Sequence, residues 1–173
     1  MGEAWGVQYA APRRGVPAAA SFRRWIAAAL AGVVRSGGGT VRVVDESESA
    51  ALNEAYRGKR GPTNVLSFTF DPPPGWAVDY LGDLVICAPV VLREAQEQGK
   101  SARAHFAHLA VHGSLHLLGY DHQNAAEAQQ MESCEIRIMN HLGFSDPYQD
   151  TDQSDSRLSL IHHDRQDVHV FQR

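Results

Sequence analysis

Three histidines stand close together in the stretch HGSLHLLGYDH, at positions 112, 116 and 122. An α-helix repeats every ~3.6 residues, so His112 and His116 lie on one face, about 6 Å apart along the helix axis. Gly119 tolerates a left-handed backbone, which can end the helix and turn the chain back before His122. Three neutral imidazoles with no fourth ligand in the motif describe a zinc site with one position open for water. The sequence therefore predicts one zinc ion per chain, bound by His112, His116 and His122.

The residue after the first histidine distinguishes this motif from that of the zinc peptidases. In HExxH a Glu at that position acts as the base, and here the position holds Gly113. A zinc peptidase with this motif would therefore lack its catalytic base. A structural zinc site would need a fourth protein ligand. Cys134 is the nearby candidate for that ligand, but we expect it to pack in the core.

Three polar neighbours of the motif have different expected roles. His108 lies one helical turn before His112 and can support that ligand from behind. Asp121 either orients an imidazole or shapes the turn after Gly119, and the sequence leaves both alternatives open. We expect His105 to be a core histidine with a hydrogen-bond partner.

Apolar spacing and turn residues predict the elements that position these side chains. Gly37 to Gly39 are predicted to stop the first helix, Ser47 or Ser49 to cap the second, and Ser101 to cap the long helix that carries the histidines. Strands and helices alternate, which favours a layered α/β or α+β domain. The predicted strands cover 4–10, 40–45, 63–70 and 82–88, and the predicted helices cover 18–35, 47–58, 89–98, 101–118 and 124–143.

Length and composition describe one globular domain followed by a tail. The chain has 173 residues, is 43% hydrophobic and carries a net charge of -4, so it is not a globally basic nucleic-acid binder. From Asp146 to residue 173 the chain has six Asp and three Arg, a net charge of -3. Residues 1–145 therefore carry a net charge of only -1, which permits a local basic patch on the domain. We predict a domain over 1–147 and an acidic, disordered tail over 148–173.

The cysteines and the apolar runs indicate the compartment. Cys87 and Cys134 are isolated and lack CxxC spacing, which is typical of a reduced protein without disulfides. The first residues lack the apolar stretch of a signal peptide, and no run approaches the ~20 apolar residues of a membrane span. We therefore expect a cytoplasmic protein with no membrane association.

Three ordered blocks of the sequence resemble one known family. HGSLHLLGYDH is similar to the HGxLHLxGYDH signature of the YbeY family, bacterial ribosomal RNA maturation factors and single-strand-specific endoribonucleases. ESAALNEAYRGKRGPTNVLSF resembles the family's LN..YR....TDVLSFP segment, and LGDLVICAPVV resembles its following strand. Together they span roughly residues 40 to 145. Asn64 stands where many members have Asp, and Thr69 where they have Pro.

The resemblance implies a mixed sheet flanked by helices, with the metal at the bottom of a cleft. We accordingly expect a single α+β domain with a mixed, roughly four-stranded sheet and a metal site at the end of a long helix. By position, the resemblance assigns the zinc ligands to His112, His116 and His122 and the functional arginine to Arg57. We take Arg57 and His116 as the catalytic residues. Arg57, Lys59 and Arg60 are candidate phosphate-binding cations, although Arg57 alone also suits a surface cation that ends a helix.

The function implied by the resemblance is zinc-dependent cleavage of single-stranded RNA. Its context would be maturation of ribosomal RNA, especially the 3′ end of the small-subunit RNA, and ribosome quality control, with the small ribosomal subunit and its assembly factors as partners. Two alternatives remain open. One is a metal-dependent hydrolase of another substrate such as peptides, and the other is a non-catalytic ribosome assembly factor whose zinc is structural.

Overall fold

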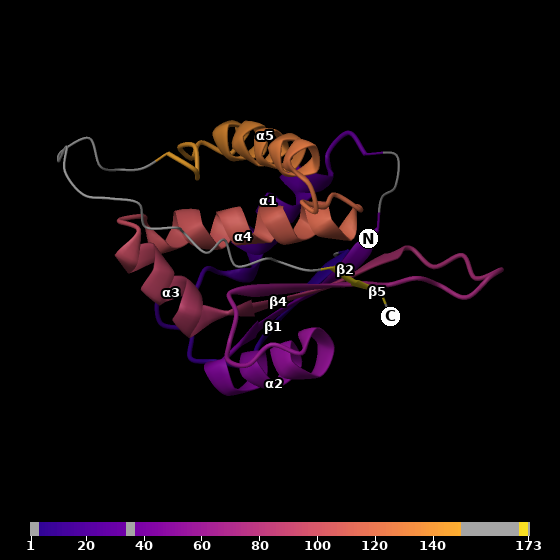
Figure 1. Cartoon of the computed structure of the whole chain (residues 1–173), viewed down its shortest axis with the longest axis horizontal. Helices are drawn as coiled ribbons and strands as arrows, with labels where there is room; N and C mark the ends of the chain where they lie inside the picture. Colours follow the sequence, from indigo (N-terminus) through magenta and orange to yellow (C-terminus); the bar gives the residue numbers. More distant parts are fainter. Residues whose placement is uncertain (1–3, 34–36, 150–169, 173) are drawn as a thin grey trace.

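The computed structural model describes residues 4–33, 37–149 and 170–172 of the chain (Figure 1). Every predicted helix and strand is present within these ranges. In chain order the elements are β1 (Trp5–Tyr9), α1 (Ala19–Leu30), β2 (Gly38–Val44), α2 (Glu46–Arg57), β3 (Val65–Thr69), β4 (Tyr80–Cys87), α3 (Ala88–Glu97), α4 (Ala102–Leu117), α5 (Ala125–His141) and β5 (Val170–Gln172).

The strands form one mixed sheet in the order β1-β2-β4-β3-β5. β1, β2 and β4 run parallel, whereas β3 is antiparallel to β4. The short β5 adds to the free side of β3 in parallel. The expected α+β domain with a mixed sheet of about four strands is therefore confirmed, with β5 as a short addition at one edge.

Helices cover both faces of this sheet (Figure 1). α1 and α4 pack against each other, and α4 also packs on β3 and β4. α5 lies on the side of α4 that faces away from the sheet, so α4 is the middle layer. α2 covers the opposite face of the sheet. No helix in the described part of the chain is long and apolar enough to cross a membrane.

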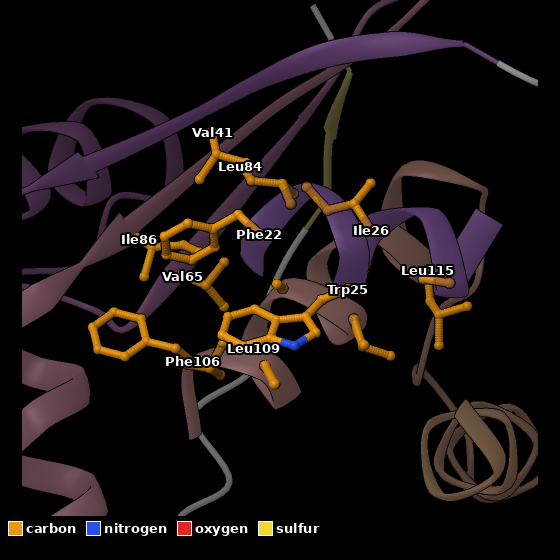
Figure 2. Close-up of a cluster of buried hydrophobic side chains, with 14 of the residues drawn as sticks. Phe22, Trp25, Ile26, Val41, Val65, Leu84, Ile86, Phe106, Leu109 and Leu115 are labelled. Carbon is orange, nitrogen blue, oxygen red and sulfur yellow. The ribbon is translucent and has the colours of Figure 1, made fainter. Parts of the chain in front are cut away.

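The main core fills the space between the sheet and the helices α1 and α4, as Figure 2 shows. Phe22 packs edge to face against Trp25 and Phe106, with ring centroids 5.5 and 6.0 Å apart. Burying such large aromatic side chains stabilises a fold through their area and adds about 0.5–1.5 kcal/mol per aromatic pair. A smaller core lies under α2 and includes Val44, Leu66, Phe68, Val85, Cys87 and Val90.

Two predicted helix boundaries are wrong, and one is confirmed. The N-cap of α2 is Asp45, whose carboxylate accepts a hydrogen bond from the Glu48 backbone N–H at 2.9 Å; Ser49 instead bonds the Thr63 carbonyl. The first helix ends at Leu30, because Ala31 adopts an extended backbone with ψ of 134°; Gly32 follows with a left-handed φ of 78°, while Gly38 and Gly39 belong to β2. Ser101 caps α4 as predicted.

The predicted tail over 148–173 falls mostly outside the described residues. Residues 148, 149 and the three residues of β5 are the described part of it. The boundary after residue 147 stays a prediction.

Helix α4 packs closely on the sheet at Gly113. A Cβ atom at this position would lie 2.8 Å from Leu84 Cδ2 and 3.1 Å from Ser67 Oγ. The Ser67 hydroxyl also donates a hydrogen bond to the Gly113 carbonyl at 3.1 Å. Packing therefore accounts for a glycine in the middle of this helix, where glycine is intrinsically unfavourable.

We predict that Gly113→Ala destabilises the protein. Overpacking costs about 1–3 kcal/mol, and the better helix propensity of alanine offsets about 1 kcal/mol of that cost, so a net loss of up to about 2 kcal/mol is expected. Chemical denaturation measures this loss. Gly6→Ala is the matched control, because a Cβ there meets only Thr40 Oγ1 at 4.0 Å. Equal stability of the two variants would contradict the packing explanation.

Candidate metal centre

The last turn of α4 and the loop after it bring the three predicted ligands together. α4 ends at Leu117, and Gly119 follows with a left-handed φ of 96°. The Tyr120 N–H bonds the Leu115 carbonyl at 3.1 Å, which folds the chain back over the helix end. One ring nitrogen from each of His112, His116 and His122 then lies within 4.8 Å of the others.

The donor set fits a zinc ion. The Nε2 atoms of His112 and His116 are 3.1 Å apart, close to the roughly 3.4 Å that two tetrahedral Zn–N bonds of about 2.0–2.1 Å would give. The His122 ring centroid lies 5.3 Å from that of His116. Among the described residues, no further His, Cys, Asp or Glu joins this group of three. Cys134 lies elsewhere: it packs against the main core, with Sγ 3.7 Å from an Arg137 nitrogen.

Burial prepares His116 to act as a ligand. Its side chain is fully buried, and desolvation, followed by the charges of His112 and His122, lowers its pKa from 6.5 to about 3. The imidazole of His116 is therefore neutral at neutral pH, which is the form that binds a metal. The His112 side chain is 14% exposed, so the group retains some contact with solvent.

Glu135, on α5, is the site residue that the sequence analysis missed. Its side chain is completely buried, and its carboxylate accepts hydrogen bonds from His112 Nδ1 and from His108 Nε2, the latter at 3.2 Å. Burial alone would raise the pKa of Glu135, but the charge of His112 and the bonds from both rings hold that pKa well below its usual range. One signal was available: Glu135 occupies the apolar stripe of α5, four residues after the buried Met131 and three before Ile138.

The other polar neighbours of the motif have defined contacts. Asp121 accepts a hydrogen bond from the His122 backbone N–H at 2.7 Å, a contact that shapes the turn. His108 reaches His112 through Glu135, and burial lowers the pKa of His108. His105 is a buried histidine bonded to Glu94 at 3.2 Å, as expected of a core residue.

The predicted phosphate-binding cations lie apart from the histidines. Arg57 is the last residue of α2, and Gly58 ends that helix in a left-handed conformation. α2 and α4 cover opposite faces of the sheet, and both end toward the β3–β4 loop (Figure 1). Arg57 is half-buried, whereas Lys59 and Arg60 are exposed. The structure thus brings the three histidines and Glu135 together, whereas the three cations lie at and just after the end of α2, a helix that covers the other face of the sheet.

A surface cavity of about 290 Å³ adjoins the turn after α4. It lies between the turn and the start of α5 and is lined by Leu118, Gly119, Tyr120, Asp121, Glu127 and Gln130. None of the three histidines is among these lining residues. This cavity is therefore a neighbour of the histidine group and does not contain it.

Known proteins share this sequence and fold. The family model described as Endoribonuclease YbeY matches residues 19–143. Proteins named Endoribonuclease YbeY from Xanthomonas campestris and Nitrosococcus oceani are each 57% identical to this chain, over 83% of it and over 91% and 95% of their own lengths. A solution structure of a Thermotoga maritima protein shares the fold, with a TM-score of 0.51 and 20% identity over 84% of this chain and 99% of its own. The chain belongs to the endoribonuclease YbeY family.

Proposed function

We propose that this chain is a zinc-dependent, single-strand-specific endoribonuclease that acts in the maturation of ribosomal RNA. The observation that carries the proposal is the group of three imidazoles whose ring nitrogens lie within 4.8 Å of one another. The names of the relatives, which describe endoribonucleases, support the same activity. The expected substrate is the 3′ end of the small-subunit RNA, and the same activity would serve ribosome quality control.

The chemistry divides between a bound ion and the residues of the chain. A bound zinc ion would supply Lewis acidity, which activates water and stabilises the negative charge that develops on a phosphodiester. The three imidazoles would hold the ion as neutral ligands, with His116 kept neutral by burial. A carboxylate base of the HExxH kind is excluded at position 113, because even a Cβ there meets Leu84 and Ser67. This packing disfavours the peptidase alternative.

Arg57 would hold the substrate at a second point. A guanidinium can bind a phosphate through two parallel hydrogen bonds, and the exposed Lys59 and Arg60 add positive charge nearby.

The proposed substrate also suggests the partners and the compartment. An enzyme that trims ribosomal RNA would work in the cytoplasm, on the small ribosomal subunit and alongside its assembly factors. The alternative of a non-catalytic assembly factor with structural zinc makes a different prediction for the ligand variants.

We predict that loss of one ligand abolishes zinc binding and RNA cleavage while the fold persists. His116→Ala removes a fully buried ring, so His122→Ala, at a half-buried turn position, is the companion variant. Metal analysis should fall from about one zinc per chain to none, cleavage of single-stranded RNA should fall to background, and circular dichroism should stay unchanged for His122→Ala. His141→Ala, an exposed histidine at the end of α5, is the control.

Two outcomes would overturn the catalytic proposal. The first is unfolding of both ligand variants together with an inability of the zinc-loaded wild type to cleave RNA, which is the behaviour of a structural site. The second is a His122→Ala protein that keeps its zinc and cleaves RNA at the wild-type rate.

We also predict that Arg57→Ala weakens cleavage without changing the zinc content. A hydrogen bond to a charged group contributes about 1.5–3 kcal/mol, so kcat/KM should fall about 10- to 100-fold. Arg57→Lys should recover part of the loss, since it keeps the charge but not the two-pronged geometry. Arg14→Ala, at an exposed position before α1, is the control. Unaltered RNA turnover in Arg57→Ala would remove this residue from the site.

A further inference from the structure

The segment after α5 packs against the helix that carries the histidines. The Asp146 carboxylate accepts a hydrogen bond from the Tyr148 N–H at 2.8 Å, which closes a tight turn around the buried Pro147. Lys100, in the corner between α3 and α4, donates a hydrogen bond to the Pro147 carbonyl. The turn is thus held by its own hydrogen bond and by the one from Lys100, and together these fix the position of Tyr148.

Tyr148 reaches the buried carboxylate behind the metal ligands. Its ring stands edge to face on His108, with centroids 5.3 Å apart, and its hydroxyl donates a hydrogen bond to Glu135. Glu135 therefore accepts from three donors: the Tyr148 hydroxyl, His108 Nε2 and His112 Nδ1. A fully buried charge is tolerated only when it is paired and hydrogen-bonded in this way.

The geometry points to Glu135, oriented by His108 and Tyr148, as the positioning residue for the metal ligand His112. The Glu135 carboxylate faces Nδ1 of His112, which favours the tautomer of the neutral ring that carries its proton on Nδ1. Its Nε2 then keeps a lone pair, and this is the atom that lies 3.1 Å from His116 Nε2. The inference rests on the proposed function, because it assumes that the three histidines bind the metal.

Tyr148 in this arrangement couples the segment after α5 to the proposed metal centre. Carboxylates behind metal-binding histidines fix the ring orientation and raise its basicity, and their loss typically lowers metal affinity about 10- to 100-fold. Tyr148 acts one step further away, through Glu135. The contribution of Tyr148 to metal affinity should therefore be smaller than that of Glu135 and should depend on the Glu135 carboxylate.

The experiment compares the zinc dissociation constants of full-length variants by competition with a chromophoric chelator. Glu135→Gln keeps the side-chain shape and should weaken zinc binding about 10- to 100-fold. Tyr148→Phe removes one neutral donor and should weaken it about 2- to 10-fold. Glu132→Gln makes the same substitution three residues earlier on α5 and should leave the constant unchanged. In the double variant the effect of Tyr148→Phe should be smaller than in the wild type, as expected of residues that act through one another.

Two further measurements separate positioning from packing. Nitrogen NMR of the metal-free wild type should show His112 protonated on Nδ1, with a tautomer mixture in Glu135→Gln. Thermal unfolding of the metal-free variants reports the purely structural effect. A Glu135→Gln protein that binds zinc as tightly as the wild type, or a wild-type His112 protonated on Nε2, would overturn the inference. A wild type that binds zinc through the histidines but does not cleave RNA would overturn the proposed function and leave the positioning role intact.

Discussion

The close packing of α4 on the sheet at Gly113 is the constraint on which the metal centre depends. Leu84 and Ser67 leave no room for a side chain at that position, so the rotation of α4 about its axis is set by this contact. The opposite side of the helix, with His108 and His112, then faces α5. At the next point of contact, Leu117 Cδ2 would lie 2.9 Å from a Cβ at Gly82, which holds the C-terminal end of α4 against β4. The turn at Gly119 starts from that fixed end, and the position of His122 follows from it.

Burial shifts the pKa values of His116 and Glu135 in opposite directions, because it disfavours the charged form of each: it lowers the pKa of the histidine and raises that of the carboxylic acid. Desolvation lowers the pKa of His116 to about 3, so the ring is neutral. Glu135 is buried as deeply, but the donors around it keep its pKa low and its charge in place. The same layer of the protein therefore combines neutral nitrogen ligands with one anchored negative charge behind them. This combination suits a divalent cation, whose charge the carboxylate partly offsets through His112.

Local patterns were sufficient to predict most of the fold, and non-local contacts account for what was missed. Helical spacing and turn residues located every described element before β5, and the histidine spacing with Gly119 predicted the group that the turn brings together. The cap of α2 was missed because the candidate Ser49 finds a partner fourteen residues away in Thr63. Glu135 and Tyr148 were missed for the same reason. The histidine partners of Glu135 lie on α4, the hydrogen-bond partner of Tyr148 is Glu135 on α5, and periodicity marks position 135 only as buried. A carboxylate in an apolar helical stripe is the signal that such a partner exists.

The carboxylates around the histidines also limit what the chain itself can contribute to proton transfer. Asp121 is bound to the His122 backbone N–H, and Glu135 is bound to three donors in a fully buried position. Each is committed to holding the shape of the centre, and position 113 has no room for a third. Both carboxylates therefore help to hold the shape of the candidate centre. The proposed reactivity would then depend on the ion that the imidazoles are proposed to bind and on the substrate held beside it.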